Sequence, residues 1–358
     1  MGVFETIGSD THEEVLFGSD PATSLRTIVA IHDTTLGPAL GGTRFYPYPD
    51  EEAALRDVLR LSKGMTYKAS AAGLDLGGGK AVVIGDPATL KSEELLLAYA
   101  RIIDSLGGRY ITAEDVGTTA TDMVTIRRGT EWVSGLPLDN GGSGDPSPWT
   151  SRGVVTAMRA VAQRLFGSSD LTGRRVAVQG VGKVGGGVVE LLEQANADII
   201  IADVDDEKSE RYERTHGCKP VELEDIYAVD CDIFSPCALG ASLSEATIPE
   251  LRCAAIVGSA NNQLAAEEDA DRLAEREILY APDFVVNAGG IINIAVELDG
   301  YSEERATALV DRIADNLIEV LDAAERLGTT PHEAATRVAR DRIEAAGAPK
   351  LHRGVRRS

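Results

Sequence analysis

The chain has 358 residues, is 43% hydrophobic and carries a formal net charge of −22. A chain of this length can form two domains of ordinary size, each with its own core. The acidic excess argues against nucleic acid or an anionic membrane as a partner, because both would repel such a surface. No apolar run approaches the length needed to span a bilayer, and residues 1–14 have neither a basic start nor an apolar core. We therefore expect a cytoplasmic protein.

The first part of the chain shows short apolar strands that alternate with helical periodicity, which indicates an α/β domain. The expected elements are a half-covered strand over 24–33, a glycine-punctuated loop over 36–43, a helix that Asp50 caps and that ends at Ser62, a buried strand over 80–84, a helix over 92–106 and a strand over 109–113.

Two lysines, Lys68 and Lys80, lie among small residues in a segment that includes the glycine triplet 77–79. The whole chain has eight lysines, and three of them fall between Lys63 and Lys80. A lysine in an apolar, glycine-lined pocket loses hydration, so its pKa falls and its neutral amine can take a proton near pH 7. Such a lysine is a candidate catalytic base. The alternative is a surface loop with solvated ammonium groups, which the glycines disfavour because they let a ligand approach the backbone.

Asp115 comes just after the strand predicted over residues 109–113. An aspartate past a strand end, in the same half of the chain as the two lysines, can lie in the same cleft. The alternative is that Asp115 caps the helix suggested by residues 121–128.

The second domain carries a nucleotide-binding pattern. After a Gly, Pro, Ser and Asn-rich junction over 135–148 and a helix over 150–166, a buried strand at 175–179 runs directly into Gly180-Val-Gly182-Lys-Val-Gly185. A helix and a second strand follow, and Asp203 closes that strand about 20 residues after the glycines, which is the spacing of a dinucleotide site. The alternative is a plain βαβ turn. The carboxylate of Asp203 would repel a 2′-phosphate, so NAD is preferred to NADP.

Further strands are expected over 231–234, 254–257 and 284–287. Ligands of open parallel sheets lie at the carboxyl ends of the strands, so Asn262 and Asn287 are placed to contact the nicotinamide side. Either asparagine could instead cap a loop. Long amphipathic helices are predicted over 303–327 and 331–346. The four cysteines, at positions 218, 231, 237 and 253, show no CxxC spacing, so reduced thiols are expected and no metal is predicted.

Several motifs resemble those of the leucine dehydrogenase branch of the glutamate, leucine, phenylalanine and valine dehydrogenase family. They are Gly41-Gly-Thr-Arg44, Lys63-Gly-Met-Thr-Tyr-Lys68, Gly77-Gly-Gly-Lys80, Tyr110-Ile-Thr-Ala-Glu-Asp-Val-Gly117, Gly180-Val-Gly182 and Asn287-Ala-Gly-Gly290. The resemblance implies reversible NAD-dependent oxidative deamination of an L-amino acid by a homo-oligomer. It also implies an α/β substrate and oligomerisation domain, residues 1–135 plus 331–358, a Rossmann-type domain, residues 136–330, and a cleft between them.

The resemblance also implies a role for individual residues. Lys68 would bind the substrate α-carboxylate, Lys80 would activate the water that attacks the imine carbon, and Asp115 would shuttle the amino proton. Gly42 and Asn262 would hold the carboxylate and amino ends of the substrate, and Met65 would line the site. The residues implied for dinucleotide binding are Thr150, Gly180, Val181, Gly182, Lys183, Val184, Gly185, Asp203, Ala260, Asn262 and Asn287.

The substrate side-chain pocket would, by resemblance, contain Leu40, Ala113, Ile291 and Ile294. Leu40 offers no cation for a distal carboxylate, so glutamate is disfavoured and leucine, isoleucine and valine fit best. Phenylalanine dehydrogenase activity, or a relative that binds NAD and amino acid without turnover, are the alternatives. Lys183 departs from the neutral residue of related leucine enzymes and could contact the pyrophosphate or relax the preference for NAD.

The acidic excess and the few lysines predict a protein that works at high salt, where screening removes self-repulsion between carboxylates. We expect both activity and the thermal midpoint to rise between low and molar KCl or NaCl. Thermal unfolding and rate measurements across that range check the prediction, and a flat or falling response would contradict it.

Overall fold

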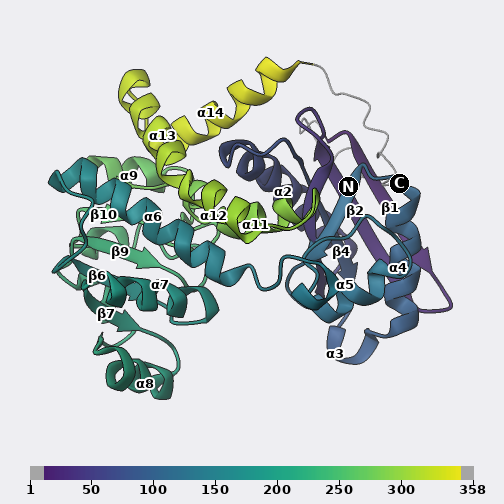
Figure 1. The fold of residues 1–358 in the computed structure, drawn as a ribbon, viewed down its shortest axis with the longest axis horizontal. Coiled ribbons are helices and arrows are strands. Elements are labelled where there is room, and N and C mark those ends of the chain that lie inside the picture. The colour runs from purple at the N-terminus through teal and green to yellow at the C-terminus, as the bar shows by residue number, and fades with distance from the viewer. Residues whose placement is uncertain (1–11, 348–358) are drawn as a thin grey trace. The chain divides into compact units, whose positions relative to one another are not determined.

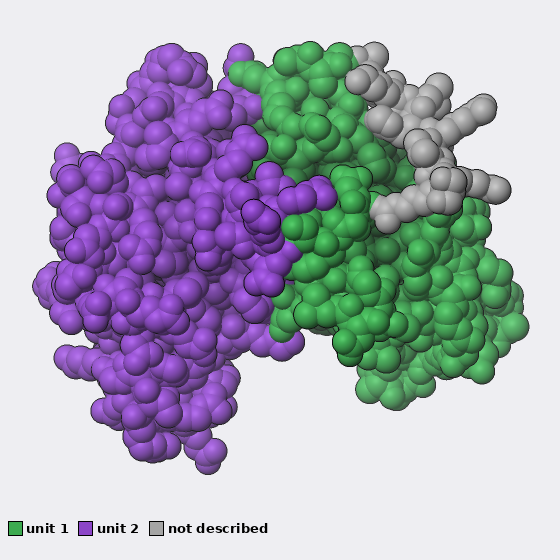
Figure 2. Space-filling model, in the orientation of Figure 1, with its two compact units in different colours: residues 1–145, 294–302, 339–358 green, residues 146–293, 303–338 purple. Residues whose placement is uncertain are grey.

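The computed structural model describes residues 12–347 and divides them into two compact units. Unit 1 consists of residues 12–145, 294–302 and 339–347, and unit 2 of residues 146–293 and 303–338 (Figures 1 and 2). The predicted bounds at 135/136 and 330/331 therefore differ from those of the structure.

The first segment of unit 1 extends to Asp145, beyond the predicted bound at residue 135, and contacts of Glu297 explain this extension. Its buried carboxylate accepts backbone N–H groups from Gly135 at 3.0 Å, Leu136 at 3.5 Å and Ser143 at 2.9 Å. These bonds hold the residues after 135 to unit 1. The helix predicted over 331–346, which was expected to belong wholly to the first domain, is divided between the two units. Its residues from Ala339 onward belong to unit 1, and those before it belong to unit 2.

Unit 1 is built on a mixed five-stranded sheet in the order β1-β2-β4-β3-β5. β2 pairs antiparallel with both β1 and β4, and β3 lies between β4 and β5, parallel to both. The strands are β1 (Glu14–Asp20), β2 (Leu25–Asp33), β3 (Ala39–Tyr46), β4 (Gly77–Ile84) and β5 (Tyr110–Glu114).

Helices cover both faces of this sheet, because alternate residues of each strand point to opposite sides. Ile28 and Ala30 of β2 lie in the cluster with α2, whereas Val29 and Ile31 lie in the cluster with α4 and α5. Each fully buried valine or isoleucine side chain contributes about 1.5–3 kcal/mol of transfer free energy. The helices of this unit are α2 (Glu51–Ala71), α3 (Pro87–Leu90), α4 (Glu93–Ser105), α5 (Ala120–Arg127) and the 3-10 turn η1 (Leu138–Asn140).

Unit 2 contains a parallel six-stranded sheet in the order β11-β10-β9-β6-β7-β8. The chain enters the sheet at β6, continues outward through β7 and β8, and returns to β9 on the other side of β6. This is the strand order of a doubly wound dinucleotide-binding fold, whose switch point lies between β6 and β9. The strands are β6 (Arg175–Gln179), β7 (Asp198–Ala202), β8 (Lys219–Pro220), β9 (Ile233–Pro236), β10 (Ala255–Ile256) and β11 (Leu279–Tyr280).

Helices precede, connect and follow these strands. They are α6 (Ser147–Phe166), α7 (Lys183–Gln194), α8 (Asp206–His216), η2 (Asp225–Ala228), η3 (Ile248–Glu250), α9 (Asp269–Glu275), α10 (Asp283–Val286), α11 (Gly289–Glu297), α12 (Glu303–Asp311), α13 (Ile313–Leu327) and α14 (Pro331–Ala346). The two-domain α/β fold class predicted from the sequence, with a Rossmann-type second domain, is confirmed. Within residues 12–347, no helix is long and apolar enough to cross a membrane.

The structure corrects several predicted elements. The loop expected over 36–43 contains the first five of the eight residues of β3, and the helix expected to end at Ser62 continues to Ala71. Gly64 lies inside that helix, where a single glycine costs only about 1 kcal/mol relative to alanine. The strand expected over 284–287 is instead the helix α10 and its cap. The helix expected over 303–327 is divided into α12 and α13 at Arg312.

The cysteines are free thiols. Cys218, Cys231 and Cys253 are buried, and Cys237 is half-buried. Burial raises the pKa of Cys218 to about 11, so this thiol is protonated and unreactive at neutral pH.

Candidate active site

The predicted site residues are divided between the two units, and each group is described within its own unit. Unit 1 carries Leu40, Gly42, Met65, Lys68, Lys80, Ala113, Asp115 and Ile294. Unit 2 carries Thr150, Gly180, Val181, Gly182, Lys183, Val184, Gly185, Asp203, Ala260, Asn262, Asn287 and Ile291.

Lys80 and Asp115 form an ion pair in unit 1, in which the lysine is buried and the aspartate is half-buried. Lys80 lies in the interior of β4, its side chain only 6% exposed, and its Nζ is 3.1 Å from Oδ1 of Asp115. Asp115 directly follows β5, so the strand β3 lies between the strands that carry the two residues. The structure thus brings together two residues that are 35 positions apart in the sequence and that were predicted to share a cleft.

The alternative role of Asp115 as a helix cap does not apply. Helix α5 begins with a capping box in which Thr119 accepts the N–H of Asp122, and Asp122 bonds back to the N–H of Thr119. The Asp115 carboxylate is therefore available for Lys80.

Glycines in β3 allow this strand to lie unusually close to its two neighbours, β4 and β5. A Cβ at Gly41 would lie 1.8 Å from the carbonyl oxygen of Gly79, and one at Gly42 would lie 2.8 Å from Cβ of Asp115. Any larger residue at either position would push apart the strands that carry Lys80 and Asp115. Glycine inside a strand marks this kind of close backbone approach.

The glycine triplet before Lys80 packs against protein rather than leaving backbone open to a ligand. A Cβ at Gly77 would lie 2.0 Å from the carbonyl oxygen of Asp33, one at Gly78 would lie 2.1 Å from the backbone nitrogen of Thr66, and one at Gly79 would meet the Tyr110 ring at 2.6 Å. The triplet therefore lets α2 and the neighbouring strands pack directly on β4, which buries Lys80.

Burial and neighbouring charges set the ionisation of the pair. Burial lowers the pKa of Lys80, and the cation of Arg44 lowers it further, whereas Asp115 opposes both effects. Burial alone would raise the pKa of Asp115, but Lys80 and Arg44 outweigh it, so the pKa of Asp115 is lowered. The site thus holds a charged carboxylate beside an amine that loses its proton more readily than an ordinary lysine.

Lys68 and Met65 lie on the last turns of α2, three residues apart, and both are half-buried. Residues three positions apart share one face of a helix, so the two side chains point to the same side. Leu40 and Ala113 are buried on β3 and β5, where Ala113 pairs with Gly42. Ile294 is half-buried, and its carbonyl accepts the hydroxyl of Ser134 at 3.1 Å.

In unit 2 the glycine loop lies between β6 and α7, as predicted. Gly180 has a φ of +91° and approaches the chain after β9, where its Cβ would meet Ala238 at 2.7 Å. A Cβ at Gly185 would lie 1.9 Å from the carbonyl oxygen of Gly180, so this glycine lets the helix pack on the loop. Gly182 differs from both, because no described atom lies within 4 Å of the position of its Cβ.

The start of α7 has the features of a phosphate-binding helix end. Gly182 is its N-cap and provides no side-chain cap, and Lys183 and Val184 form its first turn. Helix N-termini present backbone N–H groups and a partial positive charge to anions. The exposed Lys183 adds a cation at the same end.

Asp203 lies beside the glycine loop. Its carboxylate, only 7% exposed, accepts the backbone N–H of Val181 at 2.8 Å and that of Asp205 at 3.1 Å, and Nζ of Lys208 lies 3.5 Å away. A carboxylate has about four acceptor positions, so these contacts leave capacity for a ribose hydroxyl. Lys208 was missed by the sequence analysis, although a cation five residues after the acidic residue bears directly on the choice of cofactor.

The predicted asparagines lie at one end of the same sheet but differ in burial. Asn287 is buried, and its Nδ2 donates to the Ser259 carbonyl and to Oδ1 of Asn261. No described residue donates to its Oδ1, so a buried acceptor remains for a ligand N–H. Asn262 is exposed, has a φ of +52° and fits the loop role as well as a ligand role.

The remaining predicted residues of unit 2 lie close to Asn287 in the chain or in space. Ala260 is buried, and its carbonyl lies 3.4 Å from the Nδ2 of Asn287. Thr150 is in the first turn of α6, and a Cβ at Gly290 would lie 2.9 Å from its Oγ1, which places Thr150 beside the start of α11 and Ile291. The open Gly182, the free acceptor of Asn287 and the uncapped helix end together fit a dinucleotide.

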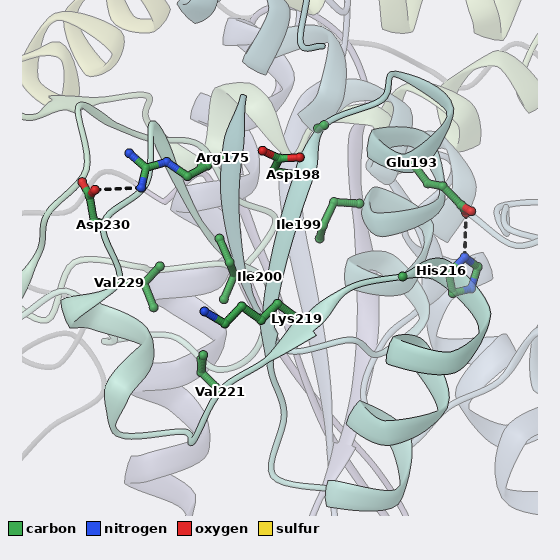
Figure 3. A pocket seen from close by; sticks show the side chains of 12 residues that line it. Arg175, Glu193, Asp198, Ile199, Ile200, His216, Lys219, Val221, Val229 and Asp230 are labelled. Carbon is green, nitrogen blue, oxygen red and sulfur yellow. Dashed lines mark hydrogen bonds and ion pairs between the residues drawn. The ribbon is translucent and has the colours of Figure 1, made fainter. Parts of the chain in front are cut away.

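A hollow of about 580 Å³ lies at the amino ends of strands of this sheet, opposite the end that carries the glycine loop (Figure 3). Its lining includes Arg175 and Asp198, which begin β6 and β7, whereas the glycine loop and Asp203 follow the ends of those strands. Arg175 pairs with Asp230, and His216 pairs with Glu193. The hollow is therefore separate from the dinucleotide site.

Comparisons with known proteins place this chain in a family. The family model described as "Glu/Leu/Phe/Val dehydrogenase, dimerisation domain" matches residues 12–132, and that described as "Glutamate/Leucine/Phenylalanine/Valine dehydrogenase" matches residues 141–209 and 201–349. A leucine dehydrogenase of Bacillus cereus is 49% identical over 96% of this chain and 94% of its own. A phenylalanine dehydrogenase of Lysinibacillus sphaericus is 47% identical over 96% of this chain and 91% of its own.

The structure of L-tryptophan dehydrogenase from Nostoc punctiforme superposes with a TM-score of 0.85 at 45% identity, over 96% of this chain and 99% of that one. Fold, site and relatives together define an amino acid dehydrogenase, an oxidoreductase that acts on the CH–NH2 group of its donors. The chain belongs to the glutamate, leucine, phenylalanine and valine dehydrogenase family, whose members depend on NAD or NADP. The resemblance found in the sequence is thereby confirmed.

Gly182→Ala provides a test of the glycine loop. Its Cβ would enter open space in the protein alone, so the thermal midpoint should stay close to that of the wild type, whereas binding of NADH should weaken by tenfold or more because phosphates need close backbone approach. Gly185→Ala is the matched comparison and should lower the thermal midpoint, since its Cβ would overlap the loop. Fluorescence titration with NADH and thermal unfolding measure both effects. Unchanged NADH affinity in Gly182→Ala would contradict the assignment.

Proposed function

We propose that this protein catalyses the reversible NAD-dependent oxidative deamination of branched-chain L-amino acids, namely leucine, isoleucine and valine, to 2-oxo acids and ammonium. The observation that carries the proposal is the buried Lys80 amine 3.1 Å from Asp115 in a chain 49% identical to a leucine dehydrogenase. Oxidation consumes water and the oxidised dinucleotide. It releases the reduced dinucleotide, ammonium and a proton.

In this proposal one residue binds the substrate and two residues transfer protons. Lys68 binds the substrate α-carboxylate as a point charge. The neutral amine of Lys80 takes a proton from the water that attacks the imine carbon of the substrate, and Asp115 takes and returns the proton of the amino nitrogen. The nicotinamide, when bound, supplies the hydride chemistry. Gly42, Asn262 and Met65 are assigned to the two ends and the wall of the substrate site.

The proposed substrate class rests on apolar residues. Leu40 and Ala113 are buried on adjacent strands, and Ile291 and Ile294 are the further pocket residues implied by family resemblance. Burial of a glutamate carboxylate beside Leu40 without a cation would cost several kcal/mol, enough to exclude that substrate. One methylene changes discrimination by only about 1–3 kcal/mol, so aliphatic substrates should overlap.

The preference for NAD over NADP rests on Asp203. Its carboxylate lies beside the glycine loop and would repel a 2′-phosphate. Lys208 and Lys183 act in the opposite sense, because either cation could attract that phosphate. We propose that the nearly buried carboxylate outweighs the more exposed lysines, since exposed charges are screened by solvent.

Two alternatives remain in competition with this proposal. The 47% identity to a phenylalanine dehydrogenase favours that activity as the second candidate. A relative that binds dinucleotide and amino acid without turnover is disfavoured, because a buried ammonium paired with a half-buried carboxylate is costly to keep without a function.

The setting of the enzyme is also part of the proposal. The family model over residues 12–132 is described as a dimerisation domain, which supports a homo-oligomer. Free thiols at all four cysteines suit the reducing cytoplasm, and breakdown of branched-chain amino acids is the proposed pathway class. Function at high salt follows from the charge of −22.

The proposed activity is tested by reduction of dinucleotide with a panel of amino acids at several salt concentrations. We expect reduction with leucine, isoleucine and valine, less with phenylalanine and none with glutamate, and a lower KM for NAD than for NADP. Faster turnover of phenylalanine would favour the second candidate. Comparable KM values for the two dinucleotides would overturn the cofactor preference, and no reduction with any amino acid would refute the enzyme proposal.

Lys80→Ala should lower kcat by about 10²–10⁴-fold, the usual contribution of a general base, and leave NADH binding intact. In the wild type, kcat for oxidation should rise with pH as Lys80 loses its proton. Because burial lowers the pKa of Lys80 from its ordinary value, the midpoint should lie below that of an ordinary lysine. Lys91→Ala is the matched control, because Lys91 forms a comparable pair with Asp122, at 2.7 Å, away from Lys80. A small loss in Lys80→Ala would contradict the assigned role.

A further inference from the structure

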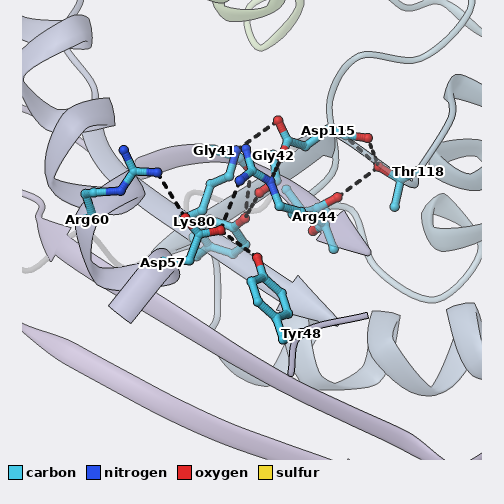
Figure 4. A network of polar contacts seen from close by, with 12 residues as sticks. Gly41, Gly42, Arg44, Tyr48, Asp57, Arg60, Lys80, Asp115 and Thr118 are labelled. Carbon is cyan, nitrogen blue, oxygen red and sulfur yellow. Dashed lines mark hydrogen bonds and ion pairs between the residues drawn. The ribbon is translucent and has the colours of Figure 1, made fainter. Parts of the chain in front are cut away.

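The side chain of Arg44 joins the carboxylates of Asp115 and Asp57 (Figure 4). Its Nε lies 2.9 Å from Oδ2 of Asp115, and its Nη1 lies 2.9 Å from Oδ2 of Asp57. Arg44 is on β3, two residues after Gly42, and Asp57 is on α2. The guanidinium thus links β3, the residue after β5 and the helix that packs on β4.

Asp115 is held by a different cation at each carboxylate oxygen. Oδ1 accepts from Lys80 and Oδ2 from Arg44, so rotation of the carboxylate would break one of the two contacts. Its backbone is fixed as well, because its N–H donates to Oγ1 of Thr118, which in turn donates to the Thr43 carbonyl. Among residues 12–347, only the side-chain contact to Arg44 orients the carboxylate independently of Lys80.

The orientation of Arg44 itself depends on Asp57. Oδ2 of Asp57 accepts the hydroxyl of Tyr48 at 2.6 Å as well as Nη1 of Arg44, and Oδ1 accepts from Arg60 at 3.1 Å. Burial and the hydrogen bond to Asp57 raise the pKa of Tyr48, so its hydroxyl remains a donor. Asp57 is therefore fixed from three directions.

We propose that Arg44 is a positioning residue of this site, which holds the Asp115 carboxylate toward Lys80 and, together with Asp57, sets the charge that Lys80 faces. The kinetic part of this proposal rests on the proposed function, in which Lys80 and Asp115 transfer protons. The electrostatic part concerns only the ionisation of Lys80, and it can be measured without substrate.

The two charges act on Lys80 with opposite sign. After burial, the cation of Arg44 lowers the pKa of Lys80, whereas the carboxylate of Asp57 raises it. The elements packed against β4 also carry other ionisable groups. They include Arg60, Lys63, Tyr67 and Lys68 on α2, His32 and Asp33 on β2, and Tyr110 and Glu114 on β5. None of these groups is replaced in either variant, although Arg60 contacts Asp57, so a comparison of the two variants tests the proposed pair of charges.

The experiment compares Arg44→Gln with Asp57→Asn in the full chain. The fraction of Lys80 acylated by trace acetic anhydride is measured by mass spectrometry as a function of pH, because only the neutral amine reacts. We expect the labelling midpoint to move to higher pH in Arg44→Gln and to lower pH in Asp57→Asn, whose amide oxygen can still accept from Arg44. Arg56→Gln on the exposed side of α2, paired with Glu52, is the control and should leave the midpoint unchanged.

Turnover tests the positioning role. Arg44→Gln should lower kcat for leucine oxidation about 100-fold with a smaller change in KM, since misplacement of a reacting group by about 1 Å has effects of that size. Arg44→Lys should restore the labelling midpoint but not kcat, because an ammonium supplies the charge without the planar guanidinium that reaches two carboxylates.

The outcomes separate this proposal from the proposed function. Midpoints that move in the same direction in both variants, or in neither, would overturn the electrostatic role of Arg44. Full recovery of kcat in Arg44→Lys would overturn its positioning role. If the labelling midpoints of the two variants move in opposite directions but the wild type oxidises no amino acid, the electrostatic role is supported and the proposed function is refuted.

Discussion

The site of unit 1 depends on an ion pair between a buried ammonium on one strand and a half-buried carboxylate that follows another strand. Removal of such charges from water costs several kcal/mol for each ion, which their attraction offsets only when the geometry is well defined. Here that geometry follows from strands that approach more closely than side chains would allow. Gly41 and Gly42 on β3 are the residues that permit it, since a methyl group at either position would overlap a neighbouring strand. The ionisation of Lys80 is thus a consequence of backbone packing.

The glycine loop of unit 2 contains both closely packed positions and an open position. Gly180 and Gly185 are required because protein atoms occupy the space of a side chain, whereas Gly182 leaves a space that no described atom fills. Asp203 completes the loop from the next strand by accepting the N–H of Val181. One acidic side chain therefore supports the loop conformation, and in the proposed function the same side chain contacts the ribose.

The sequence allowed the main features of both units to be predicted, because local patterns encode them. The strand, glycine loop, helix and Asp203 follow one another along the chain, and the lysines and Asp115 belong to recognisable motifs. The errors arose where tertiary contacts override local signals. The glycines of β3 were interpreted as a loop because composition does not reveal that a neighbouring strand needs their space. Helix α2 passes through Gly64 since packing on β4 compensates for its low propensity. The contacts of Arg44 could not be predicted from its motif, because its two carboxylate partners are 13 and 71 residues away.

Glu297 has a consequence for any attempt to divide this protein into independent pieces. Its buried carboxylate accepts three backbone N–H groups from residues 135–143, although it lies more than 150 positions later in the sequence. A fragment that stopped at Asp145 would contain every strand of the first sheet but would leave these donors without their acceptor. Autonomous folding of the N-terminal half is therefore disfavoured, and a gene fusion or split version of the enzyme would have to keep the distant segment 294–302 with it.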